Sequence, residues 1–489
     1  MVETPESHFV DFVEVINSIG GRIAKPGDAQ ITSLTLDSRQ VRPGTLFAAA
    51  PGHIRHGHEF AGDAVRAGAS AIITDREGEV SAVTYGVPVA VVDDVRGAVA
   101  RLAQEVYGPS EAMTLLGVTG TNGKTSVAYM MAGGLRAAGT PVGLVGTLGV
   151  TVGERWEKSE RTTPESPDLH RIFRECRSVG INHVVMEVSS IAASESRVTG
   201  LVFDVMVFTN LSHDHLDYHG SMDAYFHAKR SMFDSESCRQ AVVCVDTEWG
   251  VRLASELDIP VSTVATNGRD ATWSAREAGA WEVRGPGLQA SEVSRVPRFV
   301  MANRLCALAA LDACGIPAHR AWEAISHVHV PGRMECVGTV EDAPIYVDYA
   351  HSPDAIERAL GAIRGQTAGR LVVVIGAGGD RDSDKRGAMG RVSADIADLV
   401  IVTDDNPRSE DPGVIRAAVA TGARDAGSAD VIEITPREDA IRHALMFCQP
   451  GDAVILLGKG AETIQEIADV RIPFDDREVA RRIARELAT

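Results

Sequence analysis

A glycine-rich turn between an apolar run and a helical pattern constrains the fold most strongly. The run Thr114–Val118 predicts a buried strand, and Ser126–Ala138 has the pattern of a helix; the segment 117–123 holds three glycines. A strand, a tight turn and a helix in this order form the repeating unit of a mostly parallel sheet with helices on both faces. The chain is therefore expected to be an α/β protein.

The length requires more than one such sheet. At roughly 100–200 residues per domain, 489 residues predict about three domains. Strands and helices begin afresh in three stretches, which we predict as domains at 1–109, 110–331 and 332–489. The first is expected to be a small α/β domain, the second a P-loop-type nucleotide-binding parallel sheet, and the third a Rossmann-like domain.

Short apolar runs and helical patterns support this division. The expected strands are 46–50, 71–74, 89–92, 114–118, 184–186, 205–208, 241–245, 345–348, 371–376, 399–402 and 453–458. The expected helices are 95–107, 126–138, 222–233, 301–314, 353–363, 414–426 and 479–487. In sheets of this kind, ligands bind beyond the carboxyl ends of the strands, and the unusual residues cluster there.

Charge and cysteine content narrow the class of protein. The formal net charge of −19 argues against a general nucleic-acid or anionic-membrane binder, although a local basic pocket can still hold an anionic substrate. The seven cysteines contain no C-x-x-C pair, which favours reduced thiols. The N-terminus has no apolar signal-peptide region, and no run approaches the ~20 apolar residues of a membrane span. These features predict a cytoplasmic protein without a membrane span.

The segment 117–126 is the candidate phosphate-binding loop. Its glycines let backbone N–H groups point inward, and the N-terminus of the following helix adds positive potential. Lys124 can reach a terminal phosphate, and Thr125 can place its hydroxyl on Mg²⁺. The spacing departs from the standard pattern, because Val118 stands where the first glycine would be. An ordinary glycine-rich turn is the alternative.

Candidate metal ligands follow two other strands. Glu187 ends the run 184–186, where a buried carboxylate needs a cation such as Mg²⁺ or, alternatively, hydrogen bonds from the next loop. The segment His213–His219 contains three histidines, of which one could complete a Mg²⁺ shell; zinc and a hydrogen-bonded loop are the alternatives. Lys229, within the expected helix 222–233, would on composition alone be a solvated charge.

Further motifs accompany these residues in a fixed order. They are Leu36-Asp37-Ser38-Arg39, Gly120–Thr125, Thr162-Thr163-Pro164, Met186–Ser190, Asp214–Asp217, Ala228-Lys229, Pro331–Glu335, Asp348–Pro353, Gly378–Asp382 and Asp405–Arg408. The ordered set resembles the Mur ligase family over nearly the whole chain. It is most similar to the MurE branch, which adds the third residue of the peptidoglycan stem peptide.

The resemblance implies the binding residues position by position. The acceptor, UDP-MurNAc-L-Ala-D-Glu, would be held by Leu36, Ser38, His53, Thr162, Thr163, Ser189, Glu195 and Arg197. ATP would be held by Gly120, Thr121, Asn122, Gly123, Lys124, Thr125, Ser126, Asn303, Arg333, Asp348 and His351. Mg²⁺ would be bound by Thr125, Glu187, His215 and Lys229, the lysine as a carbamate formed with CO₂. The catalytic residues would be Lys124, Lys229, His215 and Glu187.

The same resemblance implies meso-diaminopimelate as the amine substrate. Its contacts would be Arg381, Asp405, Asn406, Pro407, Arg408, Gly458 and Glu462. Arg408 can fork onto the distal carboxylate, while Asp405 and Asn406 can accept hydrogen bonds from the ammonium. Lysine lacks that carboxylate and would leave Arg408 unpaired, which discriminates strongly between the two amino acids.

The implied reaction is an ATP-dependent amide ligation. ATP phosphorylates the acceptor's carboxylate, the amine attacks the acyl-phosphate, and phosphate leaves. Two Mg²⁺ ions and Lys124 would stabilise the charge of the transferring phosphoryl group. The resemblance also implies a monomer whose partners are small molecules, with no nucleic acid among them.

Several positions depart from the family pattern near the acceptor site. Arg161, Ile191 and Glu195 stand where the family usually has Asn, His and Gln, and His56-Gly57 replaces a common Asp-Gly. Glu195 adds a negative charge where an anionic acceptor should approach.

These departures leave three hypotheses open. The first is the MurE reaction, the second a related ligase with another carboxylate acceptor, and the third a catalytically silent binding or regulatory paralogue. Intact residues at the catalytic positions argue against the third, namely Lys124, Glu187, His215 and Lys229.

Overall fold

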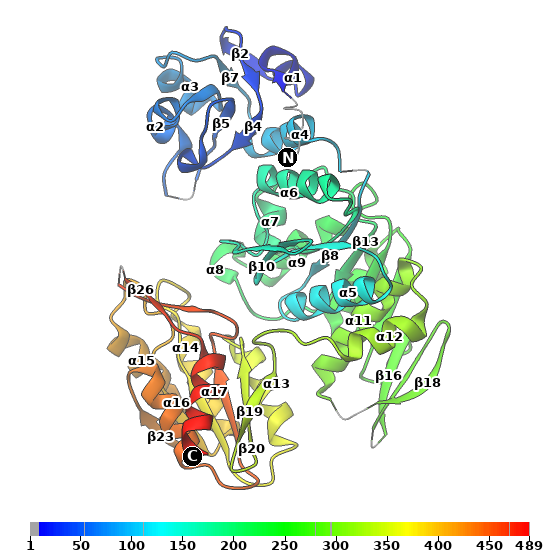
Figure 1. The fold of residues 1–489 in the computed structure, drawn as a ribbon, viewed down its shortest axis with the longest axis vertical. Helices are drawn as coiled ribbons and strands as arrows, with labels where there is room; N and C mark the ends of the chain where they lie inside the picture. The colour runs from blue at the N-terminus through cyan, green and yellow to red at the C-terminus, as the bar shows by residue number, and fades with distance from the viewer. Residues whose placement is uncertain are drawn as a thin grey trace. The chain divides into compact units, whose positions relative to one another are not determined.

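The computed structural model describes residues 9–52, 54–110, 112–278, 280–293, 296–468 and 470–488. It divides into two compact units, whose ribbons are shown in Figure 1. The first unit comprises Met1–Leu211, Asp223–Ser294 and Ala302–Ser326. The second comprises Ser212–Met222, Arg295–Met301 and His327–Thr489.

A five-stranded sheet forms the N-terminal part of the first unit. In spatial order its strands are β2 (Arg22–Lys25), β7 (Val89–Val91), β6 (Ala69–Thr74), β5 (Thr45–Ala49) and β4 (Ser33–Thr35). Only the pair of β2 and β7 is antiparallel within this sheet. A separate short pair joins β1 (Val10–Asp11) to β3 (Gln30–Ile31).

Helices cover both faces of this sheet. The buried side chains of α1 (Phe12–Ser18) and α4 (Val95–Tyr107) share one apolar cluster with one face. Those of α2 (Ala61–Arg66) and α3 (Arg76–Ala82) share a second cluster with the other face. Alternate residues of β5 point into the two clusters, as the two-residue period of a strand requires.

An eleven-stranded sheet forms the core of the central part. In spatial order its strands are β11 (Arg155–Glu157), β10 (Gly149–Val152), β9 (Val142–Gly146), β12 (His183–Glu187), β8 (Thr114–Thr119), β13 (Val205–Phe208), β14 (Ala241–Cys244), β15 (Val261–Ala265), β16 (Trp273–Ala278), β17 (Ala280–Gly285) and β18 (Leu288–Val293). The pairs from β9 to β16 are parallel, and the strands at both ends pair antiparallel.

Helices lie on both faces of the central sheet. Figure 1 shows α5 (Lys124–Ala137), α11 (Arg298–Ala313) and α12 (Ala318–Ser326) on one face, with α6 (Ser166–Ser178) and α7 (Ser190–Ser194) on the other. The remaining helices of this part are α9 (Met222–Arg230) and α10 (Glu248–Glu256). β8 and α5 flank the glycine-rich loop, as their sequence patterns predict.

The second unit contains a six-stranded sheet. In spatial order its strands are β19 (Glu335–Val340), β20 (Ala343–Asp348), β24 (Ala453–Leu457), β21 (Leu371–Ile375), β22 (Leu399–Val402) and β23 (Asp430–Glu433). Only β19 is antiparallel to its neighbour in this sheet. A hairpin of β25 (Ile464–Ile467) and β26 (Val470–Pro473) follows it in the chain.

Two apolar clusters sandwich this sheet. α13 (Pro353–Arg364), α14 (Lys385–Ile396) and α15 (Pro412–Ala426) contribute to one, and α16 (Arg437–Met446) and α17 (Asp476–Leu487) to the other. The short helix α8 (Leu216–His219) also belongs to this unit. The doubly wound arrangement predicted for the C-terminal stretch is confirmed, and so are the strands and helices expected from the sequence, with ends shifted by a few residues.

The antiparallel strands were not expected from the sequence. The central sheet is parallel only in its interior, and the meander of β16, β17 and β18 extends one edge. Strands that bury one face alternate polar and apolar residues, so they lack the continuous apolar run that marks a buried parallel strand. The boundaries 1–109, 110–331 and 332–489 stay a prediction.

Candidate active site

The loop between β8 and α5 needs glycine at two positions. Gly120 has φ +146°, and a Cβ there would lie 1.9 Å from the Thr209 hydroxyl oxygen. Gly123 has φ +89°, and a Cβ there would lie 2.4 Å from the Asn303 side-chain oxygen. Side chains would therefore strain the backbone and collide with the neighbouring residues. Asn303, predicted to contact ATP, thus lies directly against the phosphate-binding loop.

A second loop, after β13, braces the phosphate-binding loop. Asn210 accepts from the backbone N–H of Asn122 through its side chain (2.9 Å) and from that of Thr121 through its carbonyl (2.9 Å). The Thr209 hydroxyl and the Asn210 amide both donate to the Asn122 carbonyl, at 2.6 and 3.0 Å. These bonds hold the loop in the shape that an anion would meet.

Lys124 opens α5 and folds back over the loop. Its Nζ donates to the carbonyls of Gly120 and Thr121, at 2.9 Å each. The N-cap of α5 is Gly123 in the left-handed conformation, so no side chain caps this helix. A helix N-terminus beside a flexible ammonium group suits a phosphate chain. Ser126 lies in the first turn of the same helix.

The carboxylate of Glu187 is buried at the end of β12 and accepts three hydrogen bonds. Oε2 accepts from the Thr125 hydroxyl (2.9 Å) and the Thr147 hydroxyl (3.2 Å), and Oε1 accepts from the Thr147 N–H (2.8 Å). Gly146 makes room for this carboxylate, since a Cβ there would lie 2.3 Å from Oε1. Carboxylate and hydroxyl oxygens beside a phosphate-binding loop form the donor set that Mg²⁺ prefers.

Lys229 is buried, contrary to the expectation from composition. Only 1% of the residue is exposed, on α9. Its Nζ donates to the Gly120 carbonyl (3.1 Å) and to the Thr119 hydroxyl (3.4 Å), and it lies 4.6 Å from the centre of the Tyr225 ring. A lysine in this setting is not a solvated surface charge, because it contacts the phosphate-binding loop itself.

His215 belongs to the second unit, within Ser212–Met222. It is the residue before α8, has φ +52°, and its side chain is about half exposed (47%). Its Nε2 lies 3.7 Å from Asp214 Oδ2. Its role as a metal ligand stays a prediction. No group of three or more His, Cys, Asp or Glu residues gathers as a metal site anywhere in the described ranges.

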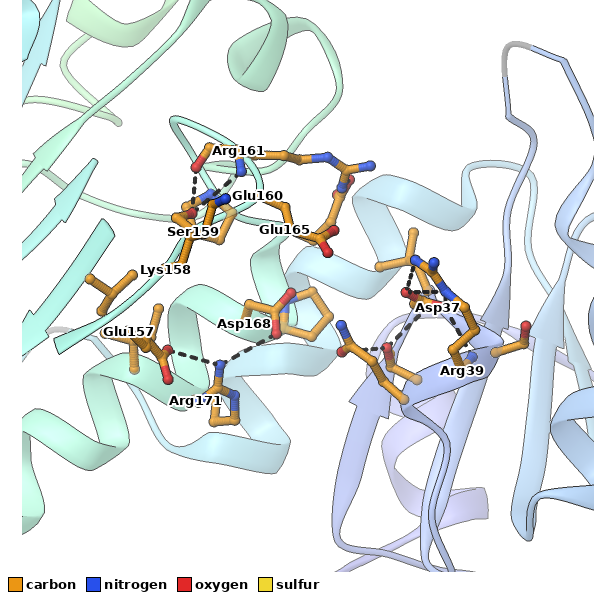
Figure 2. Close-up of a pocket in the computed structure, with 18 of the residues that line it drawn as sticks. Asp37, Arg39, Glu157, Lys158, Ser159, Glu160, Arg161, Glu165, Asp168 and Arg171 are labelled. Carbon is orange, nitrogen blue, oxygen red and sulfur yellow. Dashed lines mark hydrogen bonds and ion pairs between the residues drawn. The ribbon is translucent and has the colours of Figure 1, made fainter. Parts of the chain in front are cut away.

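A cavity of about 860 Å³ lies in the first unit, and residues of the N-terminal and central sheets line it. Leu36 and Ser38, both predicted to bind the acceptor, are part of the lining. Figure 2 shows Asp37 with Arg39 on one wall and Arg171 between Glu157 and Asp168 on another. His53, a further predicted contact, lies outside the described residues.

The other predicted acceptor residues form a network beside this cavity. Thr163 donates to the Glu187 carbonyl (3.0 Å) and accepts from the Ser189 N–H (3.0 Å). Arg197 donates to the Thr163 carbonyl (3.1 Å). Thr162 bonds the hydroxyl of Thr147 (3.0 Å). The network therefore joins the acceptor candidates to the phosphate-binding region.

The charge of Glu195 is offset inside the protein. Its carboxylate pairs with Arg197 and lies 3.9 Å from Arg96. Glu165, which lines the cavity, pairs with Arg96 (3.2 Å), Arg197 (3.3 Å) and Arg161. Two carboxylates thus face three guanidinium groups, so the departures at 161 and 195 do not leave an excess of negative charge.

The predicted nucleotide residues of the second unit surround the end of β20. Asp348 accepts from the N–H groups of Met334 (2.7 Å) and Ala350 (2.8 Å), and burial raises the pKa of its carboxyl. The Arg333 guanidinium stacks 4.2 Å from the centre of the Tyr349 ring. Burial, with a smaller effect of Lys385, lowers the pKa of His351, whose Nδ1 lies 2.8 Å from the Tyr349 carbonyl.

The loop Asp405–Arg408 follows β22 in the same unit. Arg408 has φ +52°, and its side chain donates to the Gly379 carbonyl and lies 3.6 Å from Glu466. A Cβ on Gly379 would lie 1.9 Å from the Pro407 carbonyl, so this loop packs against the loop after β21. Arg381 stands on that second loop and is exposed.

Four residues predicted for the amine site lie next to one another in two contacting pairs. Gly458 has φ +104°, and a Cβ there would lie 2.5 Å from Asp405 Oδ2. The Asn406 amide donates to Glu462 Oε2 at 2.7 Å. Asp405, Asn406, Gly458 and Glu462 are therefore neighbours, and their role as contacts of the amine substrate stays a prediction.

Sequence reasoning missed several residues that organise these sites. Thr147 donates to Glu187, the predicted metal ligand, and Asn210 bonds the phosphate-binding loop. Lys459 donates to Glu462 (3.3 Å). Each follows the carboxyl end of a strand, namely β9, β13 or β24. Their position after a strand could have marked them as site residues, because ligand sites in such sheets lie at the carboxyl ends of the strands.

No helix in the described part of the chain is long and apolar enough to cross a membrane.

Comparison with known families matches most of the chain. Residues 30–107 match the "Mur ligase family, catalytic domain", residues 118–311 the "Mur ligase middle domain", and residues 332–460 the "Mur ligase, glutamate ligase domain".

Similar proteins extend the match over nearly the full length. The UDP-N-acetylmuramoyl-L-alanyl-D-glutamate–2,6-diaminopimelate ligase of Corynebacterium glutamicum is 45% identical over 93% of this chain and 92% of its own. A solved structure of a ligase of that name is 28% identical, with a TM-score of 0.66, and covers 99% of this chain and 100% of its own. MurF of Thermotoga maritima, solved with ADP, shares the fold at 19% identity and a TM-score of 0.60, covering 93% and 96%.

Three findings agree with one another. They are the order of the three matched regions, the three-part α/β architecture, and the glycine-dependent loop at the end of β8. The chain belongs to the Mur ligase family.

Proposed function

We propose that this protein is an ATP-dependent ligase of the MurE type. It joins meso-diaminopimelate to UDP-MurNAc-L-Ala-D-Glu in the synthesis of a peptidoglycan precursor, acting in the cytoplasm as a monomer. The observation that carries the proposal is the near full-length similarity to a ligase whose name states that reaction. The loop Asp405–Arg408, beside Gly458 and Glu462, supports the choice of amino acid.

ATP would bind across the loop between β8 and α5. The proposed contacts are Gly120, Thr121, Asn122, Gly123, Lys124, Thr125, Ser126, Asn303, Arg333, Asp348 and His351. Lys124 now bonds two loop carbonyls, and it would exchange them for phosphate oxygens when a nucleotide binds. That exchange replaces neutral acceptors with charged ones, which strengthens the hydrogen bonds.

Mg²⁺ would be held by Thr125 and Glu187, with His215 as a further ligand. The buried oxygen pair of Thr125 and Glu187, 2.9 Å apart, supports this assignment, since both donors are oxygens and one is charged. The metal would neutralise charge on the transferring phosphoryl group. In this chain the Glu187 carboxylate is held in place by Thr147, whose N–H and hydroxyl both reach it.

Lys229 would act as a carbamate. Its neutral amine would attack CO₂ and lose a proton, which converts a buried cation into a carboxylate. Its position supports the assignment, because the Nζ lies 3.1 Å from the Gly120 carbonyl, at the phosphate-binding loop. A carboxylate there would provide the oxygen ligand that a second Mg²⁺ needs.

The acceptor would lie in the cavity lined by Leu36 and Ser38, and extend toward Thr162, Thr163, Ser189, Glu195 and Arg197. The ion-pair network of Glu195 with Arg197 and Arg96 removes the electrostatic objection to an anionic acceptor.

The proposed reaction has two steps. An oxygen of the acceptor's carboxylate attacks the γ-phosphorus of ATP, which gives an acyl-phosphate and ADP. The neutral amine of meso-diaminopimelate then attacks the acyl carbon and gives up one proton, and inorganic phosphate leaves with the oxygen that came from the carboxylate and takes up a proton. Lys124 and the helix N-terminus would stabilise the charge that develops on the phosphoryl group.

A phosphate-release assay tests the proposal. With ATP and Mg²⁺, phosphate release should require both meso-diaminopimelate and UDP-MurNAc-L-Ala-D-Glu, and L-lysine should replace the diamino acid poorly. Release only with some other acid would favour a different acceptor. No release with any acid in a panel would favour a catalytically silent paralogue.

A further inference from the structure

A buried lysine lies behind the proposed amino-acid site. Lys459 follows β24, and none of its surface is exposed. Its Nζ donates to the Ile464 carbonyl (2.8 Å), to Asn406 Oδ1 (3.3 Å) and to Glu462 Oε2 (3.3 Å). It also lies 4.0 Å from Asp405 Oδ1. A buried ammonium is stable only with such partners. Three of the four oxygens belong to residues proposed to hold the amino acid, and the fourth belongs to Ile464, which begins β25.

The carbonyl oxygen of Asn406 is already occupied by the protein. Oδ1 accepts from Lys459 and from the backbone N–H of Glu466 (3.0 Å), while Nδ2 donates to Glu462 Oε2 (2.7 Å). An amide oxygen has two lone pairs, and both are used here. In this arrangement Asn406 orients Glu462 and the start of the β25–β26 hairpin, and the oxygens left to receive an ammonium are those of Asp405 and Glu462.

One lysine therefore faces two carboxylates. Burial, followed by the charge of Asp405, raises the pKa of Glu462, while Lys459 and the Asn406 amide act in the opposite direction. Arg437 is a second cation near Glu462, and it forms a fully buried ion pair with Asp476 (2.7 Å). Its guanidinium also donates to the Leu457 carbonyl (2.9 Å), which braces the strand end before Lys459. Arg408 and Glu466, on the adjoining segments, lie 3.6 Å apart and offset each other.

We propose that Lys459 is a positioning residue that holds the carboxylates of Asp405 and Glu462 together so that they bind the distal ammonium of a diamino acid. Two carboxylates and one lysine leave a net charge of −1, which matches one ammonium group. Without the lysine, the two neighbouring carboxylates would repel each other, which would favour the protonated form of Glu462. The inference rests on the proposed function, because it assigns a role to the same amino-acid site.

The test is the affinity for meso-diaminopimelate between pH 6 and pH 8.5, measured by calorimetry on the full chain. For the unsubstituted protein, the Kd should stay within about twofold over this range. For Lys459→Met, the Kd at pH 6.5 should rise about tenfold or more and recover as the pH increases and Glu462 ionises. For the double variant Lys459→Met/Glu462→Gln, the Kd should be raised and independent of pH.

Two controls separate positioning from loss of fold. Arg424→Met removes an exposed positive charge from α15 of the same unit and should leave the Kd unchanged. ATP binding by Lys459→Met should stay within about twofold of the unsubstituted protein. If the Lys459→Met affinity is equally weak at every pH, or if ATP binding falls by the same factor, the inference is overturned.

The unsubstituted chain provides a test that needs no variant to fold. If its own Kd falls steeply between pH 6 and pH 8.5, Lys459 does not keep Glu462 ionised, and the inference is overturned. If Lys459→Met binds like the unsubstituted chain, the inference alone fails. If the unsubstituted chain binds no meso-diaminopimelate, the proposed function fails and this inference fails with it.

Discussion

The hydroxyl of Thr125 donates to the Glu187 carboxylate over 2.9 Å. This bond joins the first turn of α5 to the end of β12. These two neighbouring elements carry residues proposed to bind phosphate and Mg²⁺. Both oxygens belong to buried residues, so a cation that enters there would meet partly desolvated ligands and interact strongly with them.

Replacing Glu187 by glutamine should abolish most of the activity without unfolding the protein. The amide keeps the shape of the side chain but removes the charge that would hold Mg²⁺, so kcat should fall by about 100-fold or more. Steady-state phosphate release at several Mg²⁺ concentrations measures this. Glu105→Gln, an exposed change on α4, is the matched control and should retain full activity. A Glu187→Gln enzyme with an unchanged requirement for Mg²⁺ would contradict the assignment.

Replacing Lys229 by alanine should leave the enzyme nearly inactive, because the proposed carbamate cannot form. Short carboxylates such as acetate should restore part of the rate by entering the space left beside the Gly120 carbonyl. The rate with and without acetate is the measurement, and the unsubstituted protein, which should not respond to acetate, is the control. Full activity of Lys229→Ala would show that the carbamate is not needed.

Replacing Arg408 by alanine should raise the KM for meso-diaminopimelate by about 10- to 150-fold, since a charged hydrogen bond contributes about 1.5–3 kcal/mol. The KM for ATP should change little. Steady-state kinetics with each substrate varied in turn measure both values. Arg424→Ala, on the exposed surface of α15, should match the unsubstituted protein. Equal losses for ATP and for the amino acid would contradict the proposed role.

The stability of the protein should fall in mild acid because of His170. Burial, assisted by Arg177, lowers the pKa of His170 from 6.5 to about 4. Between these values His170 is protonated in the unfolded chain but not in the folded chain. The free energy of unfolding therefore decreases as the pH falls from about 6.5 to about 4. The loss is about 3 kcal/mol at the lower end.

Denaturant unfolding at pH 7 and at pH 4.5 measures that loss. His170→Leu should reduce the difference between the two pH values, because the leucine has no proton to bind. His327→Leu, at an exposed position after α12, should leave the difference unchanged. An identical pH dependence for His170→Leu and the unsubstituted protein would assign the acid sensitivity to other groups.

Much of the fold could be predicted because its signals are local. The apolar runs and the turn at Gly120–Gly123 place strands, helices and the phosphate-binding loop, and Glu187 stands out as a charge at the end of such a run. The burial of Lys229 could not be predicted, because α9 is short and mixes polar with apolar residues, and its lysine is covered through contacts made in the fold, among them that with the phosphate-binding loop.

Other residues depend on which strands become neighbours. Thr147 reaches Glu187 because β9 pairs with β12, and Asn210 reaches the phosphate-binding loop because β13 pairs with β8. Neither strand follows its neighbour in the chain, so periodicity alone could not reveal these contacts. The pairing of Lys459 with Glu462 likewise requires the fold of the segment after β24.

The most direct test of the proposed reaction follows oxygen from the acceptor to phosphate. UDP-MurNAc-L-Ala-D-Glu, with both oxygens of its reacting carboxylate labelled with ¹⁸O, is incubated with ATP, Mg²⁺, meso-diaminopimelate and the enzyme. Mass spectrometry of the products should find one ¹⁸O atom in inorganic phosphate and one in the new amide. Unlabelled phosphate, or phosphate released without formation of the amide, would contradict ligation through an acyl-phosphate.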